Sequence, residues 1–387
     1  MKNLYYLDNA ATTKTFDEIF DVMKANNDLY FYNPSASYKE AISSKKQLET
    51  AREDLTKLLR AKGGKLYFTS SATESNNTVF NGVHLRAGQT VLISAGEHPS
   101  VYNAAHSLEK KSIKVIDIPL DKTGAVDFEK YKQLLLDKSV ALVSIIHSSN
   151  ETGRINDIKM LCSYAKSVNK DIVFHSDGVQ AFGKIHVNLF DMGVDLYTIS
   201  AHKVYAPRGV GGLWVKDKTK IDALLLGGGQ ENGFRSSTEN VAGAVAFAFA
   251  AKKIYKEFEQ NYNKVLLYKK TFMDKLSESK AGEFVKFNSE LSDGFNPYII
   301  SLSVKDIKGE VLMSSLEIDG VLISTGSACS AKKAGNRILE AMGLDQSSVI
   351  GSIRVSFSPY LDYDFDYIVS CFEKNILRFE ANVLVKK

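Results

Sequence analysis

The sequence predicts an α/β fold in which a large domain with a mostly parallel sheet flanked by helices is joined to a smaller α+β domain. Three observations lead to this prediction. Between residues 65 and 215, short apolar runs alternate with segments of helical periodicity, a pattern typical of a mostly parallel sheet covered on both faces. A long helical segment then extends from about 240 to 278. Beyond it, short apolar runs are again mixed with helices, as in an α+β domain.

The predicted elements follow in chain order. Residues 4–13 are expected to form a short strand that runs into a loop of small residues. A helix is predicted over 38–60, because Leu48, Ala51 and Leu55 recur at helical spacing. The strands of the large sheet are expected at 66–69, 90–94, 114–118, 140–146, 171–175, 195–199 and 212–215, with helices between them at about 73–86, 100–111, 127–137 and 157–168. The smaller domain is expected to contain strands near 284–287, 298–304, 321–324 and 352–356, and helices near 308–317, 334–342 and 364–378.

The bulk composition is that of an ordinary globular protein. The chain has 387 residues, enough for two or three domains, of which 44% are hydrophobic and 24% charged. The formal net charge of +4 is small and no basic cluster stands out, so nucleic-acid binding is not expected. No apolar run reaches the ~18 residues of a membrane span and the N-terminus has no apolar signal core, so we expect a cytoplasmic protein. The three cysteines lack zinc spacing and cannot form a disulfide framework, so neither a metal site nor disulfides are expected.

Lys203 is the first candidate for chemistry. It follows the predicted strand 195–199 in a polar loop punctuated by glycine and proline. A lysine at the end of a buried strand is partly desolvated, so its amine loses its proton more easily and can act as a nucleophile. The chemistry that most often needs such an amine is a Schiff base with a carbonyl, usually that of pyridoxal phosphate. Taken alone, however, a lysine in a loop is more often a solvated surface residue.

Polar residues follow three further strands of the predicted sheet. His98 comes after strand 90–94, Asn150 after 140–146 and Asp177 at the end of 171–175. Each has an ordinary alternative, namely a loop histidine, an Asn/Gly turn and a helix N-cap. A buried aspartate needs a cationic partner, and a pyridinium nitrogen is such a partner. Since the carboxyl ends of parallel strands meet at one edge of a sheet, the whole set together with Lys203 indicates a site there.

The segment 69–76 indicates a phosphate ligand. Its small hydroxyl residues open a helix after strand 66–69, and a helix N-terminus offers free N–H groups and the positive end of the helix dipole. An ordinary helix cap is an equally good interpretation of this segment. The chain has no G-x-x-x-x-G-K-[ST] and no G-x-G-x-x-G pattern, so a nucleotide is less expected than another phosphate compound.

Taken together, these motifs resemble those of the cysteine desulfurases in the class V aminotransferase superfamily of fold-type I enzymes, on the branch that serves iron–sulfur cluster assembly. The resemblance covers nearly the whole chain, and the order and spacing of the motifs are specific to this group. The motifs that carry it are 6–13, 33–35, 68–77, 97–100, 149–153, 175–180, 200–203, 227–231, 235–240, 324–330 and 352–354.

The resemblance implies that pyridoxal 5'-phosphate is the cofactor and assigns residues to its ring. Lys203 is expected to hold the cofactor as a Schiff base and Asp177 to pair with the pyridine nitrogen. His98 is expected to stack on the ring and to assist proton transfer. Gln180 and Asn150 are expected near the phenolic oxygen.

The resemblance also assigns the phosphate and the substrate. Thr73, Ser200 and His202 are expected to hold the phosphate, and Ala72 belongs to the same site. Thr238 is expected to reach that phosphate from the neighbouring subunit of a homodimer. The substrate carboxylate is assigned to Asn33 and to Arg354, whose planar fork can pair with a carboxylate through two hydrogen bonds.

Cys329 is the residue that indicates which activity of this superfamily the chain has. It lies in a run of small residues, 324–331, that has little to pack and could carry its thiol to a distant substrate. Cys162 and Cys371 instead lie at helical spacing among apolar residues and are predicted to be core cysteines. By this resemblance the protein converts L-cysteine to L-alanine, leaves a persulfide on Cys329, and passes the sulfur to an acceptor such as an iron–sulfur scaffold protein, for clusters, tRNA thiolation or both.

Three alternatives remain open from the sequence: a selenocysteine lyase, a class V aminotransferase, and a non-catalytic scaffold with the same fold. The sequence departs from the usual pattern at Tyr38, Ala206, Ser71 and Ser237, none of which is assigned to chemistry. The expected domains are 14–257 for the large cofactor-binding domain, and 1–13 with 258–387 for the small domain that carries the Cys329 loop. The placement of 1–13 in the small domain rests on the resemblance alone.

Overall fold

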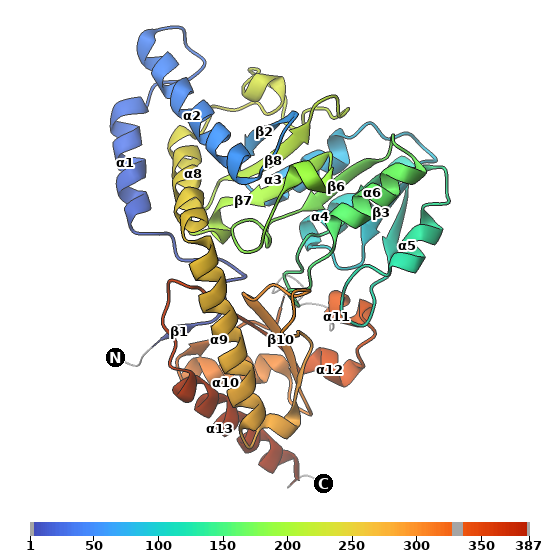
Figure 1. The fold of residues 1–387 in the computed structure, drawn as a ribbon, viewed down its shortest axis with the longest axis vertical. Coiled ribbons are helices and arrows are strands. Elements are labelled where there is room, and N and C mark those ends of the chain that lie inside the picture. Colours follow the sequence, from blue (N-terminus) through green and yellow to red (C-terminus); the bar gives the residue numbers. More distant parts are fainter. Residues whose placement is uncertain (1–3, 327–335, 385–387) are drawn as a thin grey trace.

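The computed structural model of the protein describes residues 4–326 and 336–384, with side chains up to residue 379. Figure 1 shows a broad upper part built around a large sheet and a narrower lower part. Helices α8 (Val241–Lys256) and α9 (Phe258–Glu278) follow one another along one side of both. The two termini lie at the lower part. No helix within the described ranges is long and apolar enough to cross a membrane.

The large sheet confirms the predicted mostly parallel arrangement. Its strands lie in the order β2, β8, β7, β6, β5, β3 and β4. Their bounds are Gly64–Thr69 (β2), Thr90–Ser94 (β3), Lys114–Ile118 (β4), Val140–Ser144 (β5), Val173–Asp177 (β6), Leu196–Ser200 (β7) and Gly211–Lys216 (β8). All neighbouring pairs are parallel except those of β8, which runs antiparallel to both β2 and β7.

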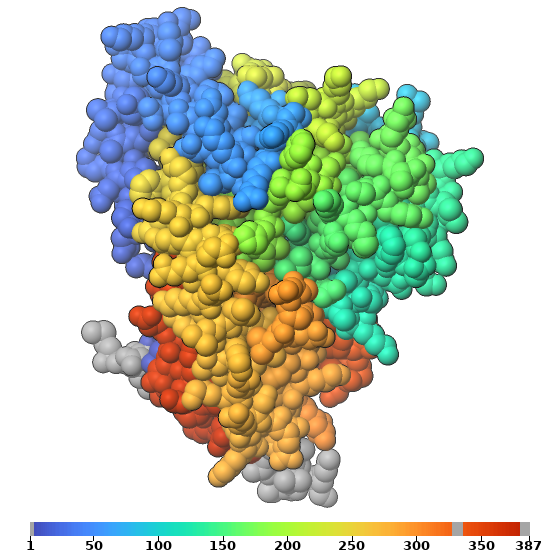
Figure 2. All heavy atoms as spheres, viewed as in Figure 1, coloured from blue at the N-terminus to red at the C-terminus, as the bar shows by residue number. Residues whose placement is uncertain are grey.

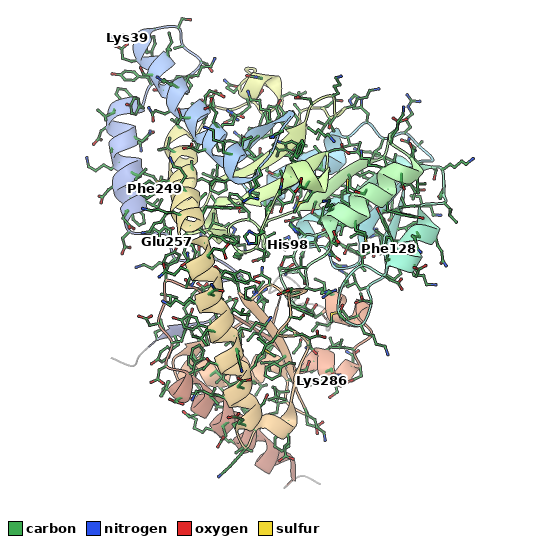
Figure 3. The ribbon with its side chains drawn as sticks, in the orientation of Figure 1. Lys39, His98, Phe128, Phe249, Glu257 and Lys286 are labelled. Carbon is green, nitrogen blue, oxygen red and sulfur yellow. The ribbon has the colours of Figure 1, made fainter. Side chains whose placement is uncertain are left out.

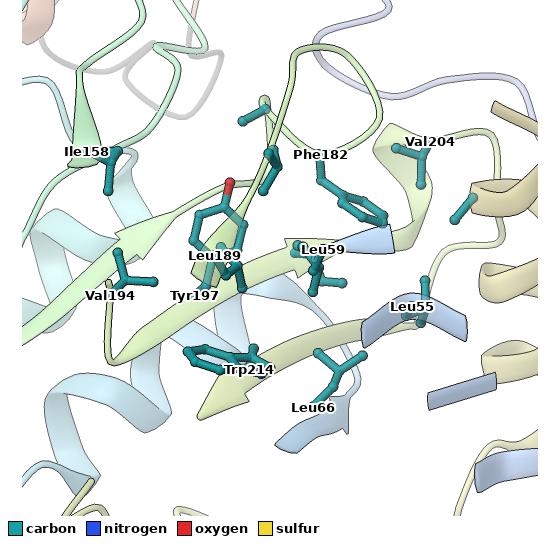
Figure 4. Close-up of a cluster of buried hydrophobic side chains, with 14 of the residues drawn as sticks. Leu55, Leu59, Leu66, Ile158, Phe182, Leu189, Val194, Tyr197, Val204 and Trp214 are labelled. Carbon is teal, nitrogen blue, oxygen red and sulfur yellow. The ribbon is translucent and has the colours of Figure 1, made fainter. Parts of the chain in front are cut away.

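Helices cover both faces of this sheet, because successive side chains of a buried strand point to opposite sides. Val91 and Ile93 of β3 join the core cluster that contains side chains of α3 and α4, whereas Leu92 joins the cluster that contains side chains of α2, α6 and α8. Figure 4 shows part of this second cluster, including Tyr197 and Trp214 of neighbouring strands. The helices are α1 (Glu18–Tyr30), α2 (Lys39–Leu58), α3 (Ala72–Gly82), α4 (Pro99–His106), α5 (Phe128–Leu134), α6 (Ile158–Val168), α7 (Leu189–Met192) and α8 (Val241–Lys256).

The sequence did not predict helix α1. Of its 13 residues only Ile19 and Asn26 are buried, so the sequence lacks the repeated apolar positions that would predict a helix. The helix packs against α8 and α2. The segment 240–278, which the sequence predicts as one long helical segment, forms two helices, α8 and α9 (Phe258–Glu278), that are joined at Glu257.

The lower part is built on a second, three-stranded antiparallel sheet in the order β12, β10 and β9. The strands are β9 (Val285–Phe287), β10 (Ile299–Val304) and β12 (Ser352–Ser356), and the helices around them are α9, α10 (Gly309–Ile318), α11 (Arg337–Ala341), α12 (Gln346–Ile350) and α13 (Phe365–Leu384). The N-terminal strand β1 (Tyr5–Tyr6) pairs in parallel with β11 (Val321–Leu322). Leu7 and Ala10 belong to the core cluster of this part. That packing supports, as a proposal, the division into residues 14–257 and residues 1–13 with 258–387.

Helix α9 contains a buried lysine that the chemistry described below does not use. Lys269 is 1% exposed, its Nζ donates to the carbonyl of Asn296 at 3.4 Å, and it lies 5.5 Å from the ring centre of Phe295. Burial lowers the pKa of Lys269 to about 7, because removal from water disfavours the charged form.

Replacing Lys269 with methionine should therefore stabilise the protein at neutral pH. The pKa of this lysine is lower in the folded chain than in the unfolded chain, so unfolding takes up a proton between about pH 7 and 10 and the unfolding free energy rises with pH across that window. Lys269→Met should lose this rise and gain about 1–3 kcal/mol at pH 7. Thermal melts from pH 6.5 to 9 measure the stability of the variant and its pH dependence. Lys270→Met, which replaces the exposed neighbouring lysine, is the control. A parent-like pH dependence in Lys269→Met would contradict the expectation.

Candidate functional site

The carboxyl ends of four neighbouring strands converge on one cavity. Strands β7, β6, β5 and β3 are neighbours in the sheet. Strand β4, which follows β3 in the chain, pairs with the other side of β3 and forms the edge of the sheet. A cavity of about 370 Å³ is lined by Asp177, the last residue of β6, and by Lys203, Asn150 and His98, which follow β7, β5 and β3. Figure 3 places His98 where the upper and lower parts meet.

The walls of this cavity come from several distant segments. They include the N-terminal segment 8–11, the start of α3 and residues of the lower part. The remaining lining residues are Asp8, Ala10, Ala11, Ser71, Ala72, Thr73, Pro99, Ser100, Ile146, Val179, Gln180, Ser200, His202, Ser324, Gly326 and Arg354. The cavity therefore lies between the large sheet and the segments 8–11, 324–326 and Arg354. It gathers nearly all of the residues that the sequence assigned to cofactor and substrate.

Two predicted site residues, Asn33 and Thr238, do not contribute to this lining. Asn33 is exposed in the connection between α1 and α2, where its Oδ1 accepts a hydrogen bond from the Ser35 backbone N–H at 2.9 Å. Thr238 is exposed in the loop before α8. Cys329 lies outside the described residues, although Ser324 and Gly326, shortly before it, line the cavity.

Lys203 ends the short turn Ala201–Lys203 that follows β7. Its Nζ donates to the backbone carbonyls of Ala10 at 2.5 Å and Ala11 at 2.6 Å. Burial, reinforced by the positive charge of Arg354, lowers the pKa of Lys203 to about 8. A substantial fraction of this amine is therefore unprotonated near neutral pH, as a nucleophile or a base requires.

Asp177 is 3% exposed at the end of β6. Its Oδ2 accepts from Nδ2 of Asn76 at 2.9 Å and its Oδ1 from the backbone N–H of Val179 at 3.0 Å. Both donors are uncharged, so they orient the carboxylate without neutralising it. A buried carboxylate that borders a cavity in this way is suited to a cationic group of a ligand.

A chain of hydrogen bonds joins Asp177 to His98. Asn76 donates to Oγ of Ser100 at 2.9 Å as well as to Asp177, and Oγ of Ser100 lies 2.8 Å from Nδ1 of His98. His98 caps α4, and desolvation lowers its pKa although the charge of Asp177 opposes this. The imidazole is thus held in place and kept largely neutral. Asn76 and Ser100 lie in the recognised motifs, but their positioning role could not be read from the sequence.

Arg354 lies in β12 at the centre of a polar cluster from both parts. Its Nη1 donates to the Asn150 carbonyl at 2.8 Å, and its Nη2 donates to Oδ1 of Asp8 at 2.9 Å. Nη1 also lies 3.7 Å from Oε1 of Glu151. These acceptors hold the guanidinium at the cavity wall. Asp8 was not among the predicted site residues, since it reads as part of a short N-terminal loop.

Several buried polar atoms around the cavity have no hydrogen-bond partner among the residues that the structure describes. They are Oγ of Ser200, Oδ1 of Asn150 and Nε of Arg354. A buried polar atom without a partner costs about 1–3 kcal/mol, so such a group of atoms at one cavity indicates that a ligand pairs with them.

The donor set fits pyridoxal phosphate. Lys203 offers an amine to an aldehyde, and Asp177 offers a negative charge to a ring nitrogen. The N-terminus of α3, together with Ser200 and the hydroxyl of Thr73, offers donors for a phosphate. His202, whose pKa burial lowers to about 3, adds a neutral imidazole that lies 3.1 Å from Oγ1 of Thr12. In the described part of the chain, no cluster of His, Cys, Asp or Glu could hold a metal ion.

Comparisons with known proteins agree with this geometry. The family model described as aminotransferase class-V matches residues 5–364. The cysteine desulfurase IscS of Dictyoglomus turgidum is 36% identical over 383 residues, which are 97% of this chain and 96% of that protein. The cysteine desulfurase IscS of Clostridium botulinum strain Hall is 34% identical over 97% of this chain and 95% of its own length. A solved structure titled NifS-like protein superposes with a TM-score of 0.88 at 31% identity, covering 97% of this chain and 100% of that one.

Proposed function

Because the chain belongs to the class-V aminotransferase family, we propose that it is a cysteine desulfurase that uses pyridoxal phosphate to convert L-cysteine into L-alanine and supplies the sulfur to iron–sulfur cluster assembly. The observation that carries the proposal is the meeting of Lys203, Asp177 and Arg354 in one cavity. An amino-acid substrate needs an anchor for its carboxylate and a base near its α-carbon. A pyridoxal cofactor needs an amine for its aldehyde and an anion for its ring nitrogen.

The chain's own residues divide the work between binding and proton transfer. When bound, pyridoxal phosphate supplies an aldehyde that condenses with amines and a ring that accepts electrons from the substrate α-carbon. Arg354 binds the substrate carboxylate, and Asp177 keeps the positive charge on the ring nitrogen. Lys203, with its lowered pKa, removes the α-proton, and the neutral His98 assists the proton transfers.

Cys329 takes the sulfur in this proposal. Its thiolate bonds to the substrate sulfur, the substrate Cβ–S bond breaks, and protonation of the remaining three-carbon unit gives L-alanine. The persulfide on Cys329 then passes its outer sulfur to an acceptor protein such as an iron–sulfur scaffold. The cytoplasmic location stays a prediction.

We propose that the protein acts as a homodimer. Asn33 and Thr238 are exposed and lie outside the cavity of their own chain, which supports roles in the cavity of a second copy. Helices α1 and α2, which form a ridge in Figure 2, and the connection between them carry exposed apolar side chains that a second copy would cover. These are Phe20, Leu29, Phe31 and Ile42, at 58–67% exposure.

The experiment that tests this function compares substrates on the cofactor-loaded protein. With L-cysteine and a thiol reductant, alanine and sulfide should form in equal amounts, and D-cysteine should give neither product. The rival functions have distinct outcomes. Turnover of L-selenocysteine without turnover of L-cysteine would make the protein a selenocysteine lyase, amino-group transfer to a 2-oxo acid would make it an aminotransferase, and a protein that binds no cofactor would be a scaffold.

A further inference from the structure

A second buried lysine lies beside the cavity without lining it. Lys184 is 5% exposed in the tight turn that follows β6, and its near neighbours in sequence, Phe182 and Ile185, are buried as well. Its Nζ donates a hydrogen bond to Oε1 of Gln180 at 2.5 Å. Burying an amine is costly, so a lysine at this position needs an explanation other than packing.

The charges around Lys184 make that cost larger. The charged groups that act on its amine are Lys203 and Arg354, and both are cations. Burial, reinforced by these two charges, lowers the pKa of Lys184 well below its ordinary value. These surroundings favour the neutral form of the amine, which still donates a hydrogen bond and adds no third positive charge beside the cavity.

The hydrogen bond from Lys184 fixes the orientation of the Gln180 amide. The carbonyl end of this amide accepts from Lys184, and its nitrogen end donates to the backbone carbonyl of Ala10 at 2.9 Å. The Gln180 backbone carbonyl accepts in turn from Nδ2 of Asn296 at 2.8 Å. An amide nitrogen carries two N–H groups, so one remains for a ligand in the cavity that Gln180 lines. Without Lys184, the carbonyl oxygen would lose its buried donor and could turn toward the cavity instead.

We propose that Lys184 is a positioning residue that holds Gln180 with an N–H group toward the bound cofactor and so favours the ionised form of the cofactor's phenolic oxygen. This inference rests on the proposed function, because it needs pyridoxal phosphate in the cavity. A donor aimed at an oxygen stabilises its anionic form, whereas a carbonyl in the same place repels it.

The test is a pH titration of the visible absorbance of the cofactor-loaded protein. Lys184→Met removes the donor and keeps the length of the side chain. The midpoint of the titration should move upward by about 0.5–1 pH unit, as expected for the loss of one hydrogen bond to the ionised form. Lys184→Leu should give the same shift and replaces Lys184→Met if that variant does not fold.

Two controls separate positioning from a general effect of losing a buried lysine. Lys269→Met also removes a buried amine, but one that contacts the Asn296 carbonyl and not a cavity residue, so its midpoint should match the parent. Gln180→Ala should shift the midpoint by itself, and adding Lys184→Met to it should change nothing more, because Lys184 acts through Gln180.

The outcomes are distinct. A folded, cofactor-loaded Lys184→Met with the parent midpoint overturns the inference and leaves the proposed function standing. An equal shift in Lys269→Met, or an additive shift on top of Gln180→Ala, overturns it as well. A parent protein that gains no visible absorbance with pyridoxal phosphate overturns the proposed function and the inference together.

Discussion

Replacing Lys203 with alanine should lower the turnover of L-cysteine by roughly 10³-fold or more, because one side chain is lost that serves both as the covalent anchor and as the base. The Nζ of Lys203 is held by the carbonyls of Ala10 and Ala11, and its pKa of about 8 leaves an amine that can take a proton near neutral pH. In the folded protein, no other lysine of the described chain lines the cavity.

Borohydride reduction of the cofactor-loaded parent, followed by peptide mapping, should place the label on the Lys203 peptide. Lys203→Ala should take up no label, and a small added amine should restore part of its turnover, since the fold and the other site residues remain. Lys216→Ala, which removes a lysine at the end of β8, should behave like the parent. A label on another lysine, or parent-like turnover in Lys203→Ala, would show that the assignment is wrong.

The rate below pH 8 should follow the protonation of this amine. The pKa of Lys203 is lowered, so the base form is lost as the pH falls through about 8, and a rate limited by proton removal should fall by about tenfold per pH unit below that value.

The sequence was sufficient to predict the strands and the residues at their ends. Apolar runs such as Val91 to Ile93 mark buried strands, and a polar residue directly after such a run must lie at the edge of the sheet. The order of the strands could not be predicted in this way. The pattern within β4 does not indicate that this strand pairs with the outer side of β3. That arrangement leaves the inner side of β3 to β5 and brings His98 and Asn150 to the same cavity.

The residues that sequence reasoning missed are those whose role depends on a distant partner. Asp8 gains its role from a hydrogen bond to Arg354, 346 positions away. Asn76 gains its role by joining Asp177 and Ser100. Lys184 gives no signal in the sequence because a lysine in a turn is ordinarily solvated, and its contact with Gln180 forms only in the folded chain. Composition and periodicity contain no signal for such contacts.

The surroundings of Cys162 and Cys371 show whether either thiol could act as a nucleophile. Cys162 and Cys371 are both buried, which confirms the prediction from their helical spacing. Burial raises the pKa of Cys162 to about 12, and that of Cys371 is raised for the same reason. Because the thiolate is the nucleophile, neither is suited to attack a substrate sulfur. The sequence holds three cysteines, so Cys329 is the remaining candidate.

Cys329→Ala should therefore reduce the formation of alanine from L-cysteine by roughly 10³-fold or more, since no thiolate remains to take the sulfur. Binding of the cofactor and of L-cysteine should persist, because Lys203, Asp177 and Arg354 are unchanged and the substrate should still alter the visible absorbance. Cys162→Ala and Cys371→Ala should retain turnover and cost about 1 kcal/mol of stability each.

Mass spectrometry after a short pulse of L-cysteine would locate the sulfur. One added sulfur atom should appear on the Cys329 peptide of the parent and on no peptide of Cys329→Ala. The matched variants Cys162→Ala and Cys371→Ala should still show it on Cys329. If the added mass lies on Cys162 or Cys371, another cysteine takes the sulfur and the assignment to Cys329 is wrong. If Cys329→Ala forms alanine at the parent rate and no peptide carries the added mass, direct release of the sulfur, as in a lyase, would explain the reaction better than transfer to the protein.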